Sequence, residues 1–409
     1  MLSTGLVIAV SAGRTSWLLP TSARPVPGSL AGLFGRSGVD LELGGLIAVL
    51  VLMFISYVAT IRGADQLSPR AVLIAIAGLN AVLLLAPPLL STDVFSYVAY
   101  GRIGAMYGAN PYLHGPNAIA VDPAYTFIAA RWVATPTVYG PLFTAVSYVL
   151  APLNVGLNVL AYKVIAAASS LAIVLVVWKT ARMRAVNPVR AVVLVGLNPV
   201  ILVFGVGGGH NDLLMLALLL TGVYVLLRNN GQASGALIVA ATAVKLTAGI
   251  LLPFVFAHNA RGRGGRGLRA VLTGAGVAAV LGGLLSFIVF GSGPFHLAST
   301  LEQVQHGGGL NSFSGLVLTL LGLGHLTGPV GLVLQIAFAI CVAWLVIRVW
   351  RGDLDWITGA GWATAALLVT AGLLLPWYVG WLVPFAALST DRRLAATAVL
   401  LTGVGLTTL

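Results

Sequence analysis

The sequence is poor in charged residues, and acidic ones are especially scarce. Only 8% of the 409 residues are charged, with ten Asp or Glu against 22 Lys or Arg. The single cysteine, Cys341, lies in an apolar run and excludes an intrachain disulfide or a cysteine metal cluster. No polar stretch is long enough for a soluble domain, and there is no Walker-type loop and no GxGxxG between a strand and a helix. These shortages argue against a soluble enzyme and against nucleotide binding.

Apolar residues make up the rest of the chain. They account for 59% of the sequence and form many separate runs of membrane-spanning length. The 50 glycines suit closely packed membrane helices. We therefore predict an all-α polytopic membrane protein, a single integral-membrane domain over 1–409, with about 13 transmembrane helices (11–14). The predicted spans are 4–20, 41–61, 71–90, 157–178, 191–206, 211–227, 233–246, 247–257, 270–290, 329–349, 356–374, 376–389 and 394–409.

Basic residues predict the orientation. The net charge of +12 comes mainly from clusters in short loops, at 179–190 and 261–269, which are typical of cytoplasmic loops and favour anionic lipid headgroups rather than nucleic acid. The N-terminus is then inside and the C-terminus outside. We interpret 4–20 as a first span and not a signal peptide, because Arg14 and Trp17 interrupt its apolar core and no clear small-residue cleavage site follows.

Two long loops and several short apolar segments are expected on the outer side. The loops are 91–138 and 291–311. The segments 139–154 and 312–327 are interpreted as half-helices that line an extracytoplasmic cavity; the alternative is that both are extra spans and the charge rule is broken. The spans 233–246 and 247–257 are both short, so we expect two helices joined by a hinge near Lys245.

Asp93 begins the first outer loop at a membrane boundary. In a helix starting just before it, Asp93 shares a face with Ser96, Tyr97 and Tyr100. Hydroxyls and aromatic rings beside a carboxylate suit a sugar, and the carboxylate is the candidate catalytic base. The alternative is a helix N-terminal charge favoured by the macrodipole. Asp122, in the same loop, is the competing base.

Two further motifs are candidates for substrate binding. His210, Asn211 and Asp212 open a span on the outer side, where they suit a phosphate, a metal or an acceptor hydroxyl; the alternative is helix capping. Lys245 lies in an apolar run without an acidic neighbour in sequence, which predicts a lipid-phosphate ligand or else snorkelling to the interface. The other predicted substrate-binding residues on this side are Arg102, His114, Tyr139, His306 and Asn311.

These motifs resemble those of the C-type (GT-C) glycosyltransferases, and most closely the actinobacterial polyprenol-phosphate-mannose-dependent α-(1→6)-mannosyltransferases. The resemblance spans 80–260, and the final third matches only in hydropathy and in Asn311-Ser312. The motifs are Ser91-Thr92-Asp93-Val94-Phe95-Ser96-Tyr97, Asn110-Pro111-Tyr112, Tyr139-Gly140-Pro141-Leu142, Gly209-His210-Asn211-Asp212 and Ala243-Val244-Lys245-Leu246. The resemblance implies that Asp93 is the base. It also implies inverting transfer of mannose from a polyprenyl-phosphate donor to a lipid-anchored mannan of the lipomannan or lipoarabinomannan type.

No metal or cofactor is required by the sequence. Many GT-C enzymes carry two adjacent acids in the first loop, whereas Val94 follows Asp93 here, which argues against a two-acid metal site; a divalent ion stays open. We expect the plasma membrane as the location, with an extracytoplasmic site. Three alternatives stay open: another prenyl-linked sugar such as arabinose or glucose, a lipid or solute transporter, and a different membrane transferase.

Overall fold

The protein is a bundle of helices of very different lengths. The computed structural model describes residues 1–35, 37–261, 265–306 and 312–407, and within these ranges no residue lies in a β-strand, which confirms the all-α prediction. The α-helices are α1 (Leu2–Ser11), α2 (Glu42–Arg62), α3 (Pro69–Leu84), α4 (Asp93–Ala105), α5 (Pro141–Leu150), α6 (Val155–Met183), α7 (Pro188–Gly196), α8 (Asp212–Leu227), α9 (Gly231–Val244), α10 (Leu252–Ala260), α11 (Arg266–Phe290), α12 (Leu297–His306), α13 (Phe313–Leu320), α14 (Thr327–Arg351), α15 (Trp356–Thr370), α16 (Val383–Leu388) and α17 (Arg392–Leu406).

Four helical segments are long and apolar enough to cross a membrane. They are α2, α6, α11 and the segment Gly324–Arg351 that contains α14, with mean hydropathies between 2.1 and 2.6. They correspond to the predicted spans 41–61, 157–178, 270–290 and 329–349. The other predicted spans are shorter or interrupted helices, so the number of crossings stays a prediction.

Two predicted spans are wrong as continuous helices. The helix of 4–20 ends at Ser11, and turns follow before Pro20. The span 191–206 is divided at Asn198 and Pro199 into α7 and a π-helix, Ile201–Val206. Pro199 has no N–H to donate, and the Asn198 side chain accepts from the next two backbone N–H groups. Hydropathy alone does not register such breaks.

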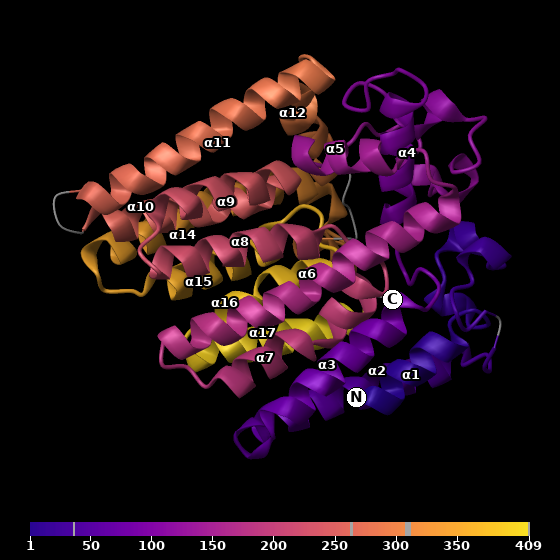
Figure 1. Cartoon of the computed structure of the whole chain (residues 1–409), viewed down its shortest axis with the longest axis horizontal. Helices are drawn as coiled ribbons and strands as arrows, with labels where there is room; N and C mark the ends of the chain where they lie inside the picture. Colours follow the sequence, from indigo (N-terminus) through magenta and orange to yellow (C-terminus); the bar gives the residue numbers. More distant parts are fainter. Residues whose placement is uncertain (36, 262–264, 307–311, 408–409) are drawn as a thin grey trace.

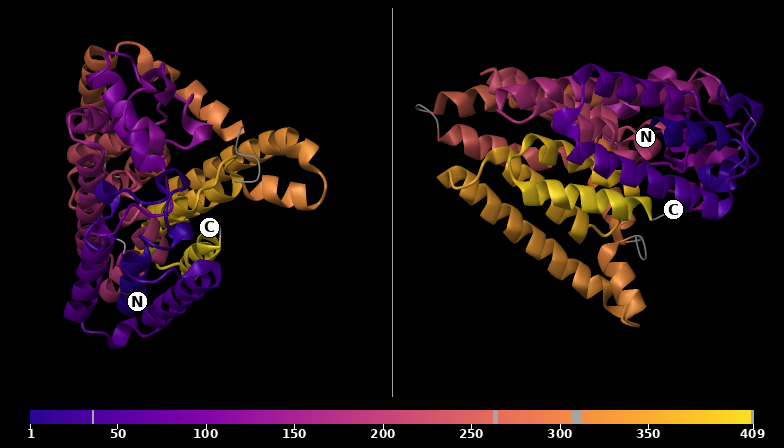
Figure 2. Two further views of the ribbon diagram at one scale, coloured as in Figure 1. Left: turned by 90° about the vertical axis from the view of Figure 1, so that its right-hand side faces the viewer. Right: turned by 90° about the horizontal axis from the view of Figure 1, so that it is seen from below.

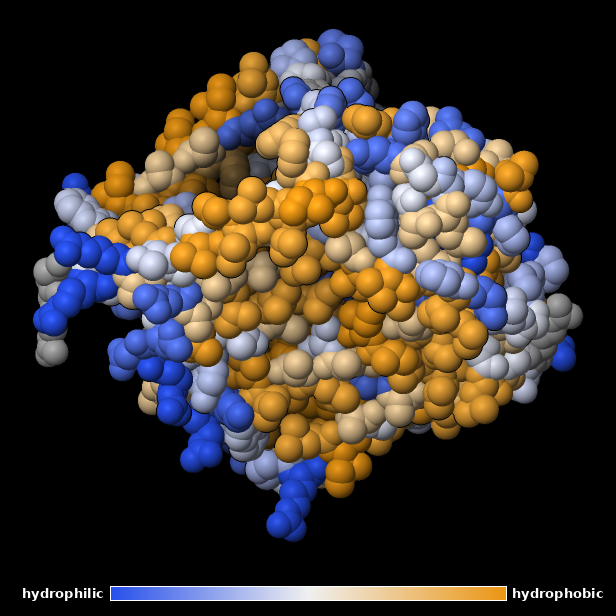
Figure 3. All heavy atoms as spheres, turned by 45° about the horizontal axis from the view of Figure 1, so that its top comes forward, coloured by the Kyte–Doolittle hydropathy of each residue, from blue (hydrophilic) through white to orange (hydrophobic). Residues whose placement is uncertain are grey.

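The helices run back and forth between two ends of the molecule (Figure 1). The turns between α8 and α9 and between α14 and α15, the end of α10 and the start of α11 lie at the left end of Figure 1, whereas the α3–α4 connection and the loop before α5 lie at the right. Figure 3 shows a broad apolar band across one face, with hydrophilic residues gathered at its left and right sides. This distribution is that of a membrane protein with two polar ends.

α13 and α14 project from the rest of the bundle (Figure 2). Only 6% of the most apolar window in Gly324–Arg351 is buried, and large side chains such as Leu332, Val333 and Ile340 are more than half exposed. An apolar surface of this extent suits lipid much better than water.

Two short helices take the places of the predicted half-helices, but they do not line the cavity described below. α5 occupies part of 139–154, and α13 part of 312–327. The cavity is lined instead by α12, α14 and residues just before α5, among them Tyr139 of the segment 139–154. The predicted lining therefore holds for 139–154 only through Tyr139, and it is wrong for 312–327. The expected hinge is present: α9 ends at Val244, Lys245 is extended, and the 3-10 helix Leu246–Leu251 leads to α10.

Candidate active site

A cavity of about 220 Å³ opens where α4, the α9–α10 hinge and the C-terminal third of the chain meet. Polar and aromatic side chains form one part of its wall: Asp93, Ser96, Tyr100, Trp132, Thr135, Tyr139, Lys245, Thr247, Tyr378 and Trp381. Most of the remaining wall is apolar and comes from α12, α14, α15 and the segment after α15: Leu301, Val304, Phe338, Leu367, Leu368, Leu373 and Leu375. The cavity can therefore hold a ligand that has one polar and one apolar part.

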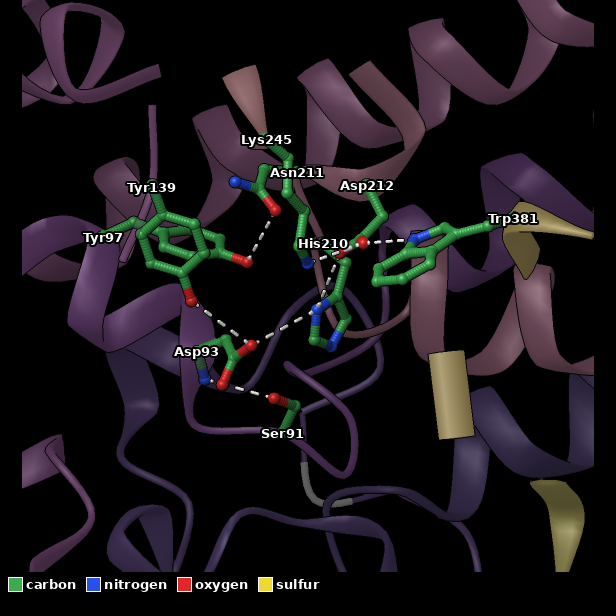
Figure 4. Close-up of polar contacts among 9 residues, drawn as sticks. All are labelled: Ser91, Asp93, Tyr97, Tyr139, His210, Asn211, Asp212, Lys245 and Trp381. Carbon is green, nitrogen blue, oxygen red and sulfur yellow. Dashed lines mark hydrogen bonds and ion pairs between the residues drawn. The ribbon is translucent and has the colours of Figure 1, made fainter. Parts of the chain in front are cut away.

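Asp93 brings a carboxylate to this cavity at the N-terminus of α4. Its side chain is 18% exposed, and its backbone N–H donates to Ser91 Oγ at 3.1 Å. The Tyr139 hydroxyl lies 3.5 Å from Asp93 Oδ2 (Figure 4). Ser96 and Tyr100 from the predicted face of α4 also line the cavity. Asp93 is thus accessible to a ligand while neighbours hold its orientation.

Tyr97, from the same face of α4, points instead into the protein. It is 1% exposed, packs edge-on against Tyr139, and its hydroxyl lies 3.4 Å from Asn211 Oδ1. Asn211 is also buried, and its Nδ2 has no hydrogen-bond partner among the residues that the structure describes. The structure therefore places Tyr97 and Asn211 behind the cavity wall.

Lys245 lines the cavity and is paired with a carboxylate from α8. Its Nζ lies 2.7 Å from Asp212 Oδ1, and the Trp381 Nε1–H donates to the same oxygen at 2.6 Å (Figure 4). The ammonium also lies 4.7 Å from the Tyr378 ring and 5.1 Å from the Trp381 ring. A cation held this way is fixed in direction and stays 13% exposed toward the cavity.

His210 lies behind Asp93 and is completely buried. Its Nδ1 is 3.6 Å from Asp93 Oδ2 and 3.8 Å from Asp212 Oδ2 (Figure 4). Burial lowers the pKa of His210, and the carboxylates of Asp93 and Asp212 oppose that shift. The Lys245 ammonium adds to the lowering. The structure thus brings the predicted His210, Asp212 and Lys245 together with Asp93.

Arg102 and Asp122 form a separate, buried cluster. Arg102 Nη1 lies 2.7 Å from Asp122 Oδ1, and its Nη2 donates to the Leu153 carbonyl. Asp122 also accepts from the Tyr107 hydroxyl and the Ala124 backbone N–H. Neither Arg102 nor Asp122 lines the cavity, so the predicted substrate contact and the competing base are both absent from it.

Three other predicted site residues lie elsewhere or outside the described structure. His114 is exposed in the loop after α4 and does not line the cavity. His306 ends α12, but its side chain and the whole of Asn311 lie outside the described residues. Among the described residues, no group of three or more His, Cys, Asp or Glu side chains is arranged to hold a metal ion.

Sequence reasoning missed the aromatic segment around Trp377. The 3-10 helix Pro376–Trp381 supplies Trp377, Tyr378 and Trp381, which contact His210, Lys245 and Asp212. Three aromatic residues within five positions were a signal for this site. A hydropathy profile does not reveal it, because it treats the segment as part of an ordinary membrane span.

Lys163 on α6 was also missed. Its side chain is 2% exposed, and its Nζ donates to the carbonyls of Ala86 and Pro87, at 3.0 Å for the latter. These carbonyls belong to the segment that leads into α4. Lys163 therefore helps to fix where Asp93 lies.

Comparison with known proteins identifies the family. The family model for "Alpha-(1->6)-mannopyranosyltransferase, N-terminal domain" matches residues 2–261, and the model for "MptB C-terminal domain" matches 308–408. The chain belongs to the alpha-(1->6)-mannopyranosyltransferase family. The resemblance seen in the motifs is therefore confirmed, and the C-terminal match extends it to the part of the chain where motifs were lacking.

Named relatives in this family include proteins of Mycobacterium tuberculosis and Corynebacterium glutamicum. Alpha-(1->6)-mannopyranosyltransferase A of Mycobacterium tuberculosis is 30% identical over 78% of this chain and 65% of its own length. Alpha-(1->6)-mannopyranosyltransferase A of Corynebacterium glutamicum is 32% identical over 52% of this chain and 46% of its own length. The B enzyme of C. glutamicum is 28% identical over 75% of this chain and 57% of its own length. The chain thus spans less than two thirds of these curated relatives.

Proposed function

We propose that this protein transfers mannose from a polyprenyl-phosphate mannose donor to a lipid-anchored mannoside acceptor, with inversion, forming α-(1→6) links of the lipomannan and lipoarabinomannan type. The observation that carries the proposal is one cavity lined by a carboxylate, an ammonium and a largely apolar wall. The names of the relatives, alpha-(1->6)-mannopyranosyltransferases, support the sugar and the linkage.

Asp93 acts as the base in this proposal. The acceptor hydroxyl gives its proton to Asp93 while its oxygen bonds to the anomeric carbon, and the bond from that carbon to the phosphate oxygen breaks. The phosphate leaves as a stable anion, so no general acid is needed. A single displacement converts a β-mannosyl phosphate into an α-mannoside.

Lys245 binds the donor phosphate. Its ammonium lines the cavity and is already oriented by Asp212 and by the Tyr378 and Trp381 rings. An ammonium held this way is a suitable point charge for a phosphate whose negative charge increases as the bond breaks.

The apolar wall suits the prenyl chain. α14 and α12 contribute to this wall, and α14 is exposed along most of its length. A prenyl chain can stay among these side chains and the bilayer while its phosphate reaches Lys245. Binding energy from the chain then positions the anomeric carbon beside the acceptor hydroxyl.

The proposal includes the membrane placement. A GT-C fold with about 13 crossings, in the plasma membrane, would have the cavity on the extracytoplasmic side. Support comes from the turn between α8 and α9 and from the start of α11, which lie at the end of the bundle away from α4 (Figure 1) and carry Arg228 and Arg266. No nucleotide sugar is needed there, since the donor is lipid-linked.

The test is transfer by the purified protein with a short α-mannoside acceptor, a chelator present, and one donor per reaction. We expect product from polyprenyl-phosphate mannose and none from GDP-mannose. Product from GDP-mannose would reject the lipid-linked donor. Product only from a prenyl-linked arabinose or glucose would reject mannose, and loss of activity in chelator would reject metal-free transfer. Movement of the lipid across vesicles without any glycoside product would favour a transporter.

A further inference from the structure

His210 is enclosed by protein yet has no hydrogen bond from its ring. Its side chain is 0% exposed, and neither ring nitrogen has a hydrogen-bond partner in the described part of the chain. Asp212 Oδ2 beside it is also buried and unpartnered. Buried polar atoms are nearly always partnered, so a carboxylate oxygen and an imidazole without a hydrogen bond, directly behind the cavity wall, need a reason.

The imidazole Nδ1 faces two carboxylates from different elements. It lies 3.6 Å from Asp93 Oδ2 on α4 and 3.8 Å from Asp212 Oδ2 on α8. A movement of less than ~1 Å closes either gap to hydrogen-bond length. Lys245 and Trp381 both hold the other oxygen of Asp212, which leaves Oδ2 facing the imidazole.

The surroundings of His210 allow a neutral resting ring and also stabilise a cationic one. Its ring centroid lies 4.0 Å from that of Trp377, whose π face attracts a cation. The net lowering of the His210 pKa, caused chiefly by burial, leaves the resting imidazole neutral. The carboxylates of Asp93 and Asp212 stabilise the ring once it is protonated, and the Lys245 ammonium opposes this.

We propose that His210 is a second proton acceptor behind Asp93, so that the acceptor's proton moves from the sugar hydroxyl to Asp93 and then to His210 Nδ1. This inference rests on the proposed function. The proton first bonds to Asp93 Oδ2 as the glycosidic bond forms and the phosphate leaves with its electron pair. It then passes to Nδ1, and Asp93 is again a carboxylate. After the product leaves, the proton returns through Asp93 to water.

The transfer to His210 restores the Asp93 carboxylate while the product is still bound. In the reverse reaction, Asp93 would return its proton to the bridging oxygen of the mannoside. While the proton is on the buried imidazole, between two carboxylates, Asp93 must first take it back before it can serve as that acid. His210 therefore acts through Asp93 and does not touch the sugar.

The variant His210→Asn tests this role in the purified protein. Asn offers an amide near the position of Nδ1 but cannot take a proton. We expect kcat to fall at least ~10-fold, with the donor KM within about 3-fold and with an altered acid side of the kcat–pH profile. In an Asp93→Asn background, adding His210→Asn should lower kcat little further, because both residues act on the same proton. Equal losses in the two backgrounds would refute the relay.

A second measurement does not depend on activity. The protein has six histidines, and the NMR signal of the His210 ring is assigned by its absence in His210→Asn. Removing the neighbouring charge in Asp93→Asn should lower the pKa of that ring, whereas the exposed Asp40→Asn should leave it unchanged. An unchanged titration in Asp93→Asn overturns the coupling. If the coupling is present but no mannosyl transfer is found, only the proposed donor and sugar fail.

Discussion

Asp93 and Asp122 are two carboxylates of the same region with opposite environments. Asp122 is 2% exposed and shares its oxygens among Arg102, Tyr107 and a backbone N–H. Its lone pairs are occupied, and its negative charge is neutralised. Asp93 is 18% exposed, faces the cavity, and has only a long contact with Tyr139 and a neutral imidazole beside it. An acid that must take a proton needs free lone pairs, so the geometry favours Asp93.

The substitution Asp93→Asn keeps the size of the side chain and the N-terminus of α4 but removes the carboxylate that acts as the base. We expect transfer to fall by ~10²-fold or more, the usual scale for loss of a general base. The exposed Asp40→Asn is the matched control and should retain full activity. Near-normal transfer by Asp93→Asn at equal amounts of folded protein would remove Asp93 from the mechanism.

Asp122→Asn should affect stability rather than chemistry. It leaves the Arg102 guanidinium, 7% exposed, without its counter-charge, which costs ~3–5 kcal/mol when a buried pair is broken. The measurement is the thermal unfolding midpoint in detergent together with the activity of the folded fraction. An unchanged midpoint with lost transfer would assign the base to Asp122 instead.

Lys245→Gln should weaken donor binding more than acceptor binding. A phosphate that loses a charged partner loses about 1.5–3 kcal/mol, or roughly a 10- to 100-fold rise in donor KM. The control is Lys179→Gln, an exposed lysine at the end of α6, which should change neither constant. If Lys245→Gln leaves both kcat and donor KM unchanged, the ammonium serves only to neutralise the charge of Asp212.

At the scale of elements, the start of α5 is packed directly on the end of α9. Gly140 donates its backbone N–H to the Val244 carbonyl at 3.0 Å, and a Cβ on Gly140 would lie 2.2 Å from the Ala243 carbonyl oxygen. The two residues that flank this contact are Tyr139 and Lys245, both in the cavity wall. The glycine in the Tyr-Gly-Pro-Leu motif thus sets the distance between two parts of the site.

Gly140→Ala should separate these two elements. Overpacking of this kind costs ~1–3 kcal/mol, and a shift of about 1 Å in site residues can reduce turnover ~10²-fold. The control is Gly249→Ala in the same hinge, where an added Cβ meets only ordinary contacts at 3.6 Å or more. Wild-type transfer by Gly140→Ala would show that the junction tolerates movement.

The sequence predicted those parts of the site that depend on local signals. Asp93 at a helix start and the break at Lys245 both follow from residues close in the chain. The pairing of Lys245 with Asp212 could not be predicted in this way, because Asp212 lies 33 residues earlier in the chain. The contact of Trp381 with Asp212 spans 169 residues. Local periodicity carries no information on such pairs. The same limit explains Arg102, whose polarity predicted a ligand although Asp122 already pairs with it.

For the fold, the prediction held where apolar runs were uninterrupted. α2, α6, α11 and α14 follow the predicted spans within a few residues at most boundaries. It failed where a side chain or a proline competes with the helix, as at Asn198 and Pro199. The packing of α12 and α14 around the cavity depends on tertiary contacts, which is why 312–327 was expected there instead.

At the scale of the whole molecule, the exposed basic residues and the candidate active site lie at opposite ends. Asp93, His210, Asp212 and Lys245 converge near the start of α4, whereas the turns at the other end carry exposed arginines such as Arg228. The apolar band lies between these ends (Figure 3). Our proposal that the cavity faces the extracytoplasmic side rests on this charge distribution, since the positive-inside rule predicts the basic end in the cytoplasm.

Single cysteines test this orientation. In a Cys341→Ser background, His114→Cys and Ser299→Cys introduce exposed thiols near the cavity end, and Gln232→Cys and Asp353→Cys introduce them at the basic end. An impermeant thiol reagent applied to intact cells should label the first pair. The second pair should react only after the membrane is opened, because the positive-inside rule keeps the arginine-rich turns in the cytoplasm. Labelling of Asp353→Cys on intact cells would show that the orientation is the reverse of the proposed one. Asp93 would then face the cytoplasm, where nucleotide sugars are present, and the physical reason for a lipid-linked donor would be lost.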